Sequence, residues 1–514
     1  MPNNKILWAD DEIDLLKPHI LFLKTKGYDV VTVNSGHDAL DLVENERFDL
    51  IILDENMPGL TGLETLQKIK LAAPNTPVIM ITKNEEENIM NQAIGSKISD
   101  YLIKPVNPNQ ILLSIKKNLH SDTLISQQAT NDYREEFSRI SSLIGECRSV
   151  SDWYNLYQRL VYWDLELATA DSNMAELLEM QKNEANNAFS KFVSRNYQSW
   201  IDGTGERPLM SPDILPRRLF PLLDNGQKVF VIVIDNFRLD QWRVIKPLLT
   251  DQFSFNEELY TTILPTATQF ARNAIFSGLM PNDIARMFPD LWVDEDSEEG
   301  KNLNESPLIA TLFERYRRNV KFSYNKINDS AAGEQILRNF ANLSHNDVNF
   351  IVLNFIDMLS HARTESKMIR ELAANSAAYR SITESWFRHS PALDLIRKMG
   401  EKGYTVLLTT DHGTIQVDNP VKVIGDRNLT SNLRYKAGKN MTYNKRDVFE
   451  IKRPSDFGLP ALNLSTTYIF ASNHDFFAYP NNYNHYVQYY TNTFQHGGIS
   501  LEEMLVPLIT MTPR

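Results

Sequence analysis

The chain has 514 residues and a formal net charge of −12 at pH 7. Its length allows roughly two to four domains with large cores. The negative charge disfavours an output domain that binds duplex DNA through a broad basic surface. The single cysteine, Cys147, excludes an intramolecular disulfide and a cysteine-cluster metal site, and it indicates a reducing compartment.

The N-terminal residues show no signal-peptide pattern. Residues 1–5 lead directly into an apolar run, and no stretch approaches the roughly 18 consecutive apolar residues of a membrane span. We therefore expect a soluble, cytoplasmic protein without a transmembrane helix.

Residues 1–120 alternate apolar runs with amphipathic stretches. The first run, Lys5–Ala9, is followed by apolar residues at helical spacing between positions 13 and 23. Four more runs follow, at residues 28–33, 49–53, 78–81 and 100–103. Five strands that alternate with helices predict a flavodoxin-like, doubly wound α/β sheet, in which ligands bind at the carboxyl ends of the strands.

Acidic, hydroxyl and amino side chains occupy those strand ends. Asp10 and Asp11 follow the first strand, and Asp54 follows the third. Three carboxylates at one edge would repel one another unless a divalent cation that prefers oxygen, most simply Mg²⁺, lay among them. Thr82 and Lys104, at the ends of the last two strands, are able to hold phosphate oxygens.

Together these residues resemble the receiver domain of response regulators. The motifs that carry the resemblance are Asp10-Asp11, Asp54 followed by Met57-Pro58-Gly59, Thr82, and Tyr101 with Lys104-Pro105. The alternative without a phosphorylation site is a flavodoxin-like domain whose acidic residues only cap strand ends. The number of matching positions, in the right order, favours the receiver.

The resemblance implies a role for each of these positions. Asp54 would accept a phosphoryl group from a sensor histidine kinase, Thr82 and Lys104 would contact that group, and Tyr101 would be the switch aromatic. The implied Mg²⁺ ligands are Asp10, Asp11, Asp54 and Asn56. Phosphorylation is expected to favour a homodimer, and Lys104-Pro105 is expected to be a cis peptide.

Residues 121–205 permit long helices. No proline occurs between Pro108 and Pro208, and Gly145 is the only glycine of that interval before Gly203. Two helical faces are apolar: Trp153, Leu156, Leu160, Trp163 and Leu167 on one, and Met174, Leu177, Leu178, Ala185, Ala188, Phe189 and Phe192 on the other. We expect a helical bundle linker, which is either a lever for the dimer signal or a passive spacer. Faces of this composition disfavour a DNA-recognition helix.

Residues 206–514 predict a second α/β domain. The apolar runs 229–234 and 405–408 read as buried strands that lead to Asp235 and Asp411. The run 349–356 reads as a third strand, which ends at Asp357. Between them, residues 263–268 lead into a helix that Ser277-Gly278 closes.

This domain carries a set of metal-ligand side chains with a hydroxyl. Its members are Asp235, Asp357, His361, Asp411, His412, His496 and the hydroxyl of Thr268. Three carboxylates and three imidazoles suffice for two zinc ions with open positions. A threonine at a helix N-terminus lies in a positive field that favours its ionisation and phosphate binding. Thr268 alone would more often be a helix cap, and Thr266 competes with it as nucleophile.

The set resembles the alkaline phosphatase superfamily, in particular its PglZ and nucleotide pyrophosphatase/phosphodiesterase branches. The motifs that match are Pro265-Thr266-Ala267-Thr268, Asp357 with His361, Thr410-Asp411-His412-Gly413 and His496-Gly497. The resemblance implies one zinc at Asp357, His361 and His496. It implies a second at Asp235, Asp411, His412 and Thr268, with Thr268 as the nucleophile that forms a phosphothreonine.

Two insertions lie between these motifs. Residues 281–345 contain the acidic run 294–299, which we expect to be a solvated loop. Residues 414–466 carry nine cations: Lys422, Arg427, Arg434, Lys436, Lys439, Lys445, Arg446, Lys452 and Arg453. With Tyr479, Tyr483, Tyr486, Tyr489 and Tyr490 they form either a surface for a nucleotide or oligonucleotide substrate, or a solvated insertion beside an aromatic core.

We therefore expect a receiver domain at residues 1–120, a helical bundle linker at 121–205 and an alkaline phosphatase-like domain at 206–514. This arrangement resembles response regulators of Bacteroidetes that govern type IX secretion and gliding. The resemblance implies a phosphorylation-controlled, zinc-dependent phosphodiesterase with type IX secretion or sigma-factor proteins as partners. The alternatives are a regulatory docking module with a structural metal site, and a phosphomonoesterase or phosphomutase.

Overall fold

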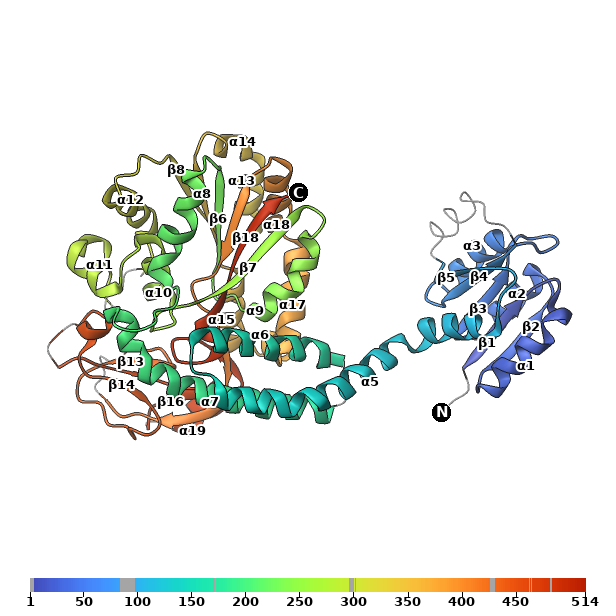
Figure 1. Ribbon diagram of the computed structural model, residues 1–514, viewed down its shortest axis with the longest axis horizontal. Coiled ribbons are helices and arrows are strands. Elements are labelled where there is room, and N and C mark those ends of the chain that lie inside the picture. Colours follow the sequence, from blue (N-terminus) through green and yellow to red (C-terminus); the bar gives the residue numbers. More distant parts are fainter. Residues whose placement is uncertain are drawn as a thin grey trace. The chain divides into compact units, whose positions relative to one another are not determined.

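A computed structural model of the chain describes residues 4–83, 98–169, 172–294, 300, 302–425, 430–461, 463, 465–480 and 483–514. The chain divides into two compact units, Met1–Asn131 and Asp132–Arg514. Helix α5 (Pro108–Glu146) begins in the first unit and continues into the second (Figure 1). Among the described residues, none of the helices combines the length and the apolar composition that a membrane crossing requires.

The first unit is built on a parallel sheet with the strand order β2-β1-β3-β4-β5. Its strands are β1 (Lys5–Ala9), β2 (Asp29–Val33), β3 (Leu50–Asp54), β4 (Val78–Thr82) and β5 (Asp100–Ile103). Its described helices besides α5 are α1 (Lys17–Thr25), α2 (Gly36–Asn45) and α3 (Gly62–Ala72). Successive side chains of the central strands point to opposite faces of the sheet and form two separate apolar clusters, one on each face. The flavodoxin-like prediction is confirmed.

Three long helices follow, as the sequence predicts. They are α5, α6 (Val150–Glu166) and α7 (Ser172–Asp202). Helix α6 begins at a capping box between Ser149 and Asp152. The Tyr133 hydroxyl on α5 donates to Gln181 Oε1 on α7 at 2.8 Å, and Trp153 on α6 packs against Phe189 on α7. These contacts join the three helices within the second unit.

The second unit centres on a six-stranded sheet with the order β7-β18-β10-β6-β9-β8. Its strands are β6 (Val229–Ile234), β7 (Phe253–Thr261), β8 (Phe322–Ile327), β9 (Val348–Leu353), β10 (Thr405–Thr409) and β18 (Leu505–Pro513). Strands β10, β6, β9 and β8 are parallel, and β18 is antiparallel to β10 and β7. Strands β6, β9 and β10 are buried along their whole length, as expected when helices cover both faces. The parallel strands therefore bring their carboxyl ends to one edge.

The prediction of a strand over residues 349–356 is wrong at its end. Strand β9 stops at Leu353, and α15 (Phe355–Glu365) begins after Asn354. Phe355 stacks on Trp386 with ring centroids 4.3 Å apart, and Ile356 is fully buried. Both apolar residues thus belong to a helix, and a short apolar run does not distinguish a strand from a buried helix turn. Asp357 and His361 consequently lie one helical turn apart.

The other helices of this unit surround the sheet (Figure 1). They are α8 (Phe220–Asp224), α9 (Leu239–Ile245), α10 (Thr268–Ser277), α11 (Pro281–Met287), α12 (Glu305–Arg315), α13 (Ser330–Arg338), α14 (Phe340–Leu343), α16 (Lys367–Leu372), α17 (Ser376–His389), α18 (Pro391–Glu401) and α20 (Leu501–Met504). Helix α10 ends at Gly278, whose φ of 64° suits glycine. The prediction that Ser277-Gly278 closes this helix is confirmed.

The basic insertion folds into small sheets beside the main one. These contain β11 (Ile415–Val417), β12 (Asn419–Lys422), β13 (Tyr435–Gly438), β14 (Phe449–Ile451), β15 (Thr467–Phe470), β16 (Asp475–Ala478) and β17 (Thr493–Gln495), with α19 (Tyr483–Tyr490) nearby in sequence. Arg427 and the acidic residues 295–299 lie outside the described residues.

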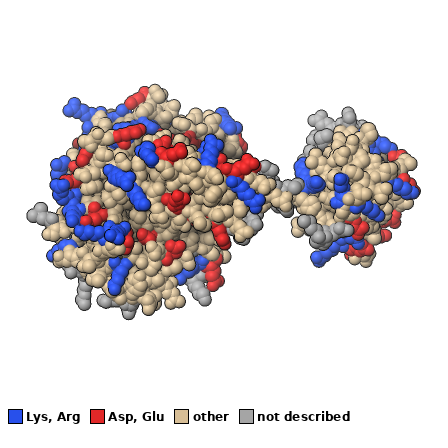
Figure 2. Space-filling model, turned by 60° about the horizontal axis from the view of Figure 1, so that its bottom comes forward, with Lys and Arg blue, Asp and Glu red and all other residues tan. Residues whose placement is uncertain are grey.

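Of the eight cations of the insertion that the structure describes, two are not on the surface. Arg434 is fully buried and pairs with Glu503 at 2.6 Å, while Lys436 is 1% exposed and donates to the Thr430 carbonyl at 2.7 Å. They hold the insertion together, so the prediction that they attract a polyanion is wrong. On the face drawn in Figure 2, Lys and Arg side chains are interspersed with Asp and Glu.

Burial lowers the pKa of Lys436 from 10.5 to about 8. Below pH 8 both folded and unfolded chains carry the proton, and the folded chain bears the full cost of the buried charge. Between pH 8 and 10.5 only the unfolded chain keeps the proton, so stability rises with pH. We expect the free energy of unfolding, relative to Lys436→Met, to rise by roughly 1–3 kcal/mol from pH 7.5 to 10. Denaturant unfolding measures it, with the exposed Lys439→Met as control, and a constant difference would contradict the prediction.

Candidate functional site

The first unit gathers three carboxylates at the carboxyl edge of its sheet. Ligand oxygens of Asp10, Asp11 and Asp54 lie within 4.8 Å of one another. Lys104 Nζ lies 2.9 Å from Asp10 Oδ2 and 2.7 Å from Asp54 Oδ1. The backbone N–H of Asn56 donates to Asp54 Oδ2 at 3.1 Å. The structure thus brings together the residues that the receiver resemblance singles out.

Burial and the charge balance shape this site. Burial, together with the charge of Asp10, raises the pKa of Asp54 despite its hydrogen bond to Lys104. Burial would lower the pKa of Lys104, but the hydrogen bonds to Asp54 and Asp10 outweigh it and raise that pKa. The oxygen-rich donor set fits Mg²⁺, which would relieve the repulsion among the carboxylates.

The switch positions lie beside these carboxylates. Thr82 is buried at the end of β4, and the half-buried Tyr101 ring packs against the core with its hydroxyl hydrogen-bonded to Thr82. The Lys104-Pro105 peptide is cis, as predicted. Threonine and aromatic side chain are therefore in contact, which the switch role requires.

The second unit gathers two further groups of ligand side chains. Asp235, Asp411 and His412 form one, and it is buried throughout. Asp357, His361 and His496 form the other; each group has ligand atoms within 4.8 Å of one another. Asp235 follows β6, the Asp411-His412 pair follows β10, and His496 follows β17. The grouping coincides with the two predicted sets.

The hydroxyl of Thr268 belongs to the buried group. Its Oγ1 lies 3.2 Å from Asp235 Oδ1 and 3.1 Å from His412 Nε2. Thr268 is the first residue of α10, and the cap residue is Ala267, so the hydroxyl is not used for capping. The Thr266 hydroxyl instead donates to the Gly498 carbonyl and accepts from the Gly497 N–H, both at 2.9 Å. The geometry favours Thr268 over Thr266 as the reactive hydroxyl.

Asn236, which the sequence analysis missed, bridges the two groups. Its backbone N–H donates to Asp411 Oδ1 at 3.3 Å, and its side-chain amide donates to Asp357 Oδ1 at 3.3 Å. Its φ of 61° is a left-handed conformation that asparagine tolerates better than most residues. An asparagine directly after a strand-end aspartate was the only available signal. The His412 and His496 rings also stack across the two groups, with centroids 4.2 Å apart.

The donor atoms are arranged as zinc ligands require. His412 Nδ1 donates to the Gly413 carbonyl at 3.0 Å, and His496 Nδ1 donates to the Thr266 carbonyl at 3.1 Å. These hydrogen bonds fix the tautomer and turn each Nε2 toward a carboxylate, as outer partners of zinc-bound histidines do. Asp411 Oδ2 is buried without a hydrogen-bond partner among the described residues. Residues and orientation fit two zinc ions.

The pKa shifts of the histidines and aspartates in both groups agree with a role as metal ligands. Burial lowers the pKa of His412, and burial together with His412 lowers the pKa of His496 to about 4, so both imidazoles are neutral. Burial and the charge of Asp235 raise the pKa of Asp411 and Asp357. A cation among these carboxylates would favour their charged form.

Arg272 balances part of the negative charge of the buried aspartates. Its Nη1 lies 2.5 Å from Asp235 Oδ2 and 3.7 Å from Asp411 Oδ2, and its Nε donates to Glu305 at 2.5 Å. Burial raises the pKa of Asp235, but Arg272 outweighs it and the pKa is lowered. Arg272 is almost completely buried, so it does not point to solvent. Glu305, from the start of α12, was missed because no motif marks it.

The second group is open on one side. The His361 side chain is 66% exposed, and its Nε2 lies 3.4 Å from Asp357 Oδ2. His496 Nε2 lies 3.8 Å from Asp357 Oδ1. A ligand can therefore reach this group from solvent along the His361 side.

Fold and site together define a receiver domain joined to an alkaline phosphatase-like output domain. The family model described as BREX system PglZ alkaline phosphatase-like domain matches residues 214–511, more than half of the chain. The chain belongs to this PglZ family. The response regulator receiver domain model matches residues 6–116, and the PorX response regulator linker domain model matches residues 123–201.

Curated relatives match part of the chain. The chain is 31% identical over 159 residues to the alkaline phosphatase synthesis transcriptional regulatory protein PhoP of Bacillus subtilis, which covers 30% of this chain and 64% of the relative. It is 35% identical over 130 residues to the CpxR homolog of Haemophilus influenzae, which covers 25% of this chain and 56% of the relative. The chain thus spans less than two thirds of these relatives.

Solved receiver domains are also similar. A CheY-like receiver domain protein from Methanospirillum hungatei JF-1 is 29% identical, with 23% of this chain and 95% of that chain covered and a TM-score of 0.23. The chemotaxis protein CheY4 of Vibrio cholerae is 30% identical, with coverage of 23% and 99% and a TM-score of 0.22.

The receiver site predicts phosphorylation at Asp54. Incubation with acetyl phosphate and Mg²⁺ should add one phosphoryl group, seen by intact mass, and Asp54→Asn or removal of Mg²⁺ with EDTA should abolish the addition. Asp49→Asn, at the opposite edge of the sheet, should behave like the native chain. Equal labelling of Asp54→Asn would refute the assignment.

The buried charges predict a metal-dependent effect of Arg272. Arg272→Leu leaves Asp235 and Glu305 without their shared cation, so we expect a loss of roughly 3–5 kcal/mol in the free energy of unfolding. Zinc should reduce this loss because it compensates Asp235. Urea unfolding with and without zinc measures both values. Arg286→Met, at a side chain 73% exposed, is the control; an equal loss in both conditions would speak against a cation at Asp235.

Proposed function

We propose that the chain is a two-component response regulator whose output domain is a zinc-dependent phosphodiesterase. The observation that carries the proposal is the Thr268 hydroxyl, placed at a helix N-terminus within 3.2 Å of Asp235 and His412. Two adjacent aspartate and histidine groups accompany it, which is the donor set of a two-zinc phosphoesterase.

The residues divide into two ion sites. Asp235, Asp411 and His412 would hold one zinc ion beside Thr268, and Asp357, His361 and His496 would hold the other. When bound, zinc supplies positive charge that lowers the pKa of the threonine hydroxyl and of water. The N-terminus of α10 adds a positive field at Thr268.

The chain's own chemistry is then a double displacement. The Thr268 oxygen attacks phosphorus, the bond to the leaving alcohol breaks, and that alcohol takes up the proton of the hydroxyl. The threonine is left as a phosphodiester that keeps the second ester group of the substrate. Water next attacks that phosphorus, the bond to the Thr268 oxygen breaks, and a phosphomonoester is released. The buried amide of Asn236 holds Asp411 and Asp357 in place through both steps.

Aromatic side chains support a nucleotide or oligonucleotide substrate. In α19 the Tyr486 and Tyr490 rings stack with centroids 6.3 Å apart, and Tyr486 is 39% exposed. The Arg370 guanidinium of α16 lies 5.4 Å from the Tyr489 ring centroid. Aromatic faces and a cation of this kind bind bases and phosphates without sequence preference.

The receiver suggests how the output is controlled. We propose that a sensor histidine kinase phosphorylates Asp54 and that the phosphorylated chain forms a homodimer in the cytoplasm. The PorX-type linker supports a role in type IX secretion and gliding, with secretion or sigma-factor proteins as partners. The proposed domain boundaries remain 1–120, 121–205 and 206–514.

A second candidate is a regulatory docking module with a structural metal site. The complete burial of Asp235, Asp411 and His412 favours it, because structural sites are closed. Exposed apolar side chains beside the open group, at Met358, Met368 and Leu372, would suit a protein partner. A phosphomonoesterase is a third candidate and would prefer terminal phosphates.

Substitution of Thr268 tests the proposal. Zinc-loaded Thr268→Val should hydrolyse bis-p-nitrophenyl phosphate at least roughly 10³-fold more slowly than the native chain, because the nucleophile is gone. Thr268→Ser should retain part of the activity. Mass spectrometry of acid-quenched native enzyme should find a p-nitrophenyl phosphoryl group on Thr268 rather than on Thr266.

The controls separate the candidates. Thr250→Val, at an exposed threonine, should have native turnover. Equal turnover by Thr268→Val would exclude Thr268 as the nucleophile. Zinc binding without diester hydrolysis would support the docking module, and a preference for p-nitrophenyl phosphate over the diester would support the phosphomonoesterase.

A further inference from the structure

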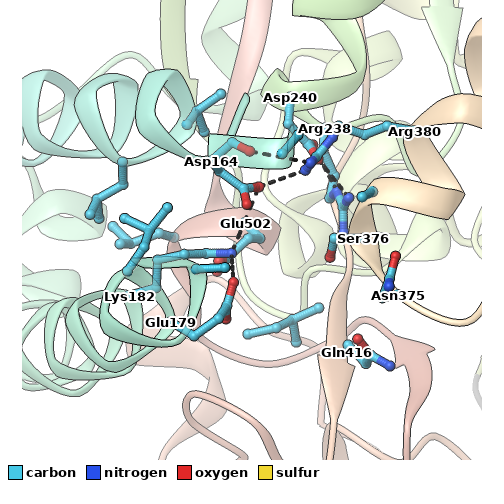
Figure 3. A pocket seen from close by; sticks show the side chains of 18 of the residues that line it. Asp164, Glu179, Lys182, Arg238, Asp240, Asn375, Ser376, Arg380, Gln416 and Glu502 are labelled. Carbon is cyan, nitrogen blue, oxygen red and sulfur yellow. Dashed lines mark hydrogen bonds and ion pairs between the residues drawn. The ribbon is translucent and has the colours of Figure 1, made fainter. Parts of the chain in front are cut away.

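A cavity of about 550 Å³ lies between the linker helices and the output domain, within the second unit (Figure 3). Helices α6 and α7 form one wall, and the turn after β6, the start of α17 and α20 form the other. Charged side chains line both walls. Asp164 pairs with Lys182 on the linker side, Arg238 pairs with Asp240 on the output side, and the ion pair between Asp164 and Arg380 joins the two walls. The cavity thus marks a place where an ion pair joins linker and output domain.

One chain of ion pairs begins on the linker helix α6. Arg380 Nη1, on α17, donates to Asp164 Oδ2 on α6 at 2.5 Å and to Asp240 Oδ2 at 3.1 Å. Arg238 donates to both Asp240 oxygens, at 2.9 and 2.7 Å. Arg238, Asp240 and Arg380 are buried. The output domain contributes two guanidinium groups and one carboxylate to this chain, and the linker contributes the second carboxylate.

The chain of ion pairs ends on the turn that follows Asp235. The connection from Asp235 to Asp240 consists of this turn and the first two residues of α9. At its beginning, Asn236 contacts Asp411 and Asp357, and the Phe237 N–H donates to Thr410 Oγ1 at 3.0 Å. Its far end is held by Arg238 and Asp240. A short turn fixed at both ends makes the position of Asp235 depend on the position of α6.

The second linker helix contacts the other ligand-bearing loop. Asn186 on α7 accepts from the Leu501 N–H at 2.7 Å and donates to Glu502 Oε2 at 3.0 Å. A Cβ at Gly413 would overlap the backbone oxygen of Glu502, and the Gly413 N–H donates to the Glu503 carbonyl at 3.0 Å. Helix α20 therefore supports the loop that carries Asp411 and His412, and α7 holds α20.

We propose that Asp164 is a positioning residue for the group formed by Asp235, Asp411 and His412, through which α6 regulates this site. The inference rests on the proposed function for its catalytic consequence, but not for its structural one. Asp164 acts through Arg380 and Asp240 and does not touch the ligand atoms. Displacement of α6 would remove the Asp164 carboxylate from the buried guanidinium of Arg380, which also holds Asp240, and would release the turn.

Hydrogen–deuterium exchange of the full chain without zinc tests the structural part. In Asp164→Ala, amides of residues 236–241 should exchange at least about fivefold faster than in the native chain. Asp164→Asn should show a smaller increase, and Asp164→Glu should restore most of the protection. Glu166→Gln, an exposed acid on the same helix, should match the native chain.

Two outcomes would overturn the proposal. Unchanged exchange at 236–241 in both Asp164→Ala and Asp164→Asn would show that the turn is independent of α6. An equal acceleration throughout the second unit would show a general structural role instead.

Kinetics with zinc test the consequence. Asp164→Ala should lower kcat for bis-p-nitrophenyl phosphate at least about fivefold, with KM unchanged within about twofold. A change in KM alone would overturn the positioning role. If the native chain has no diesterase activity, the proposed function fails, whereas the exchange experiment still decides the role of Asp164.

Discussion

The structure of the output domain depends on how it tolerates negative charge at the edge of its sheet. Strands β6 and β10 are buried along their whole length. Asp235 and Asp411 follow them in buried positions, where solvent does not stabilise their charge. Arg272 balances part of this charge, and the donor geometry of His412 leaves room for a cation to balance the rest. A buried charge without a partner would be strongly destabilising. The same excess of negative charge makes the site receptive to metal ions.

Much of the fold could be predicted because buried strands have a clear sequence pattern. Apolar runs that end in aspartate located the carboxyl edges of both main sheets, and the proline-free middle region located the linker helices. The error at β9 arose because Phe355 and Ile356 belong to a helix. Their apolar side chains pack against Trp386 and the core from that helix, not from a strand. Local pattern does not contain that tertiary information.

The candidate site was predictable to a similar degree. Strand-end acids and the resemblance together supplied the two ligand sets. Asn236 and Glu305 were missed because their roles depend on contacts between segments far apart in the chain. Arg434 and Lys436 show the same limit, since a count of cations does not reveal which of them are buried. The resemblance already preferred Thr268 to Thr266, and the hydrogen bonds of the two hydroxyls agree with that preference.

The two ligand groups lie on different kinds of secondary structure. One is fixed by loops at the edge of the central sheet, whereas the other takes Asp357 and the exposed His361 from a single turn of α15. A chelator approaching from solvent meets His361 first, and the helix can release its ligands without disturbing the sheet. Loss of the two proposed ions should therefore be stepwise, with an intermediate in which one ion remains beside Thr268.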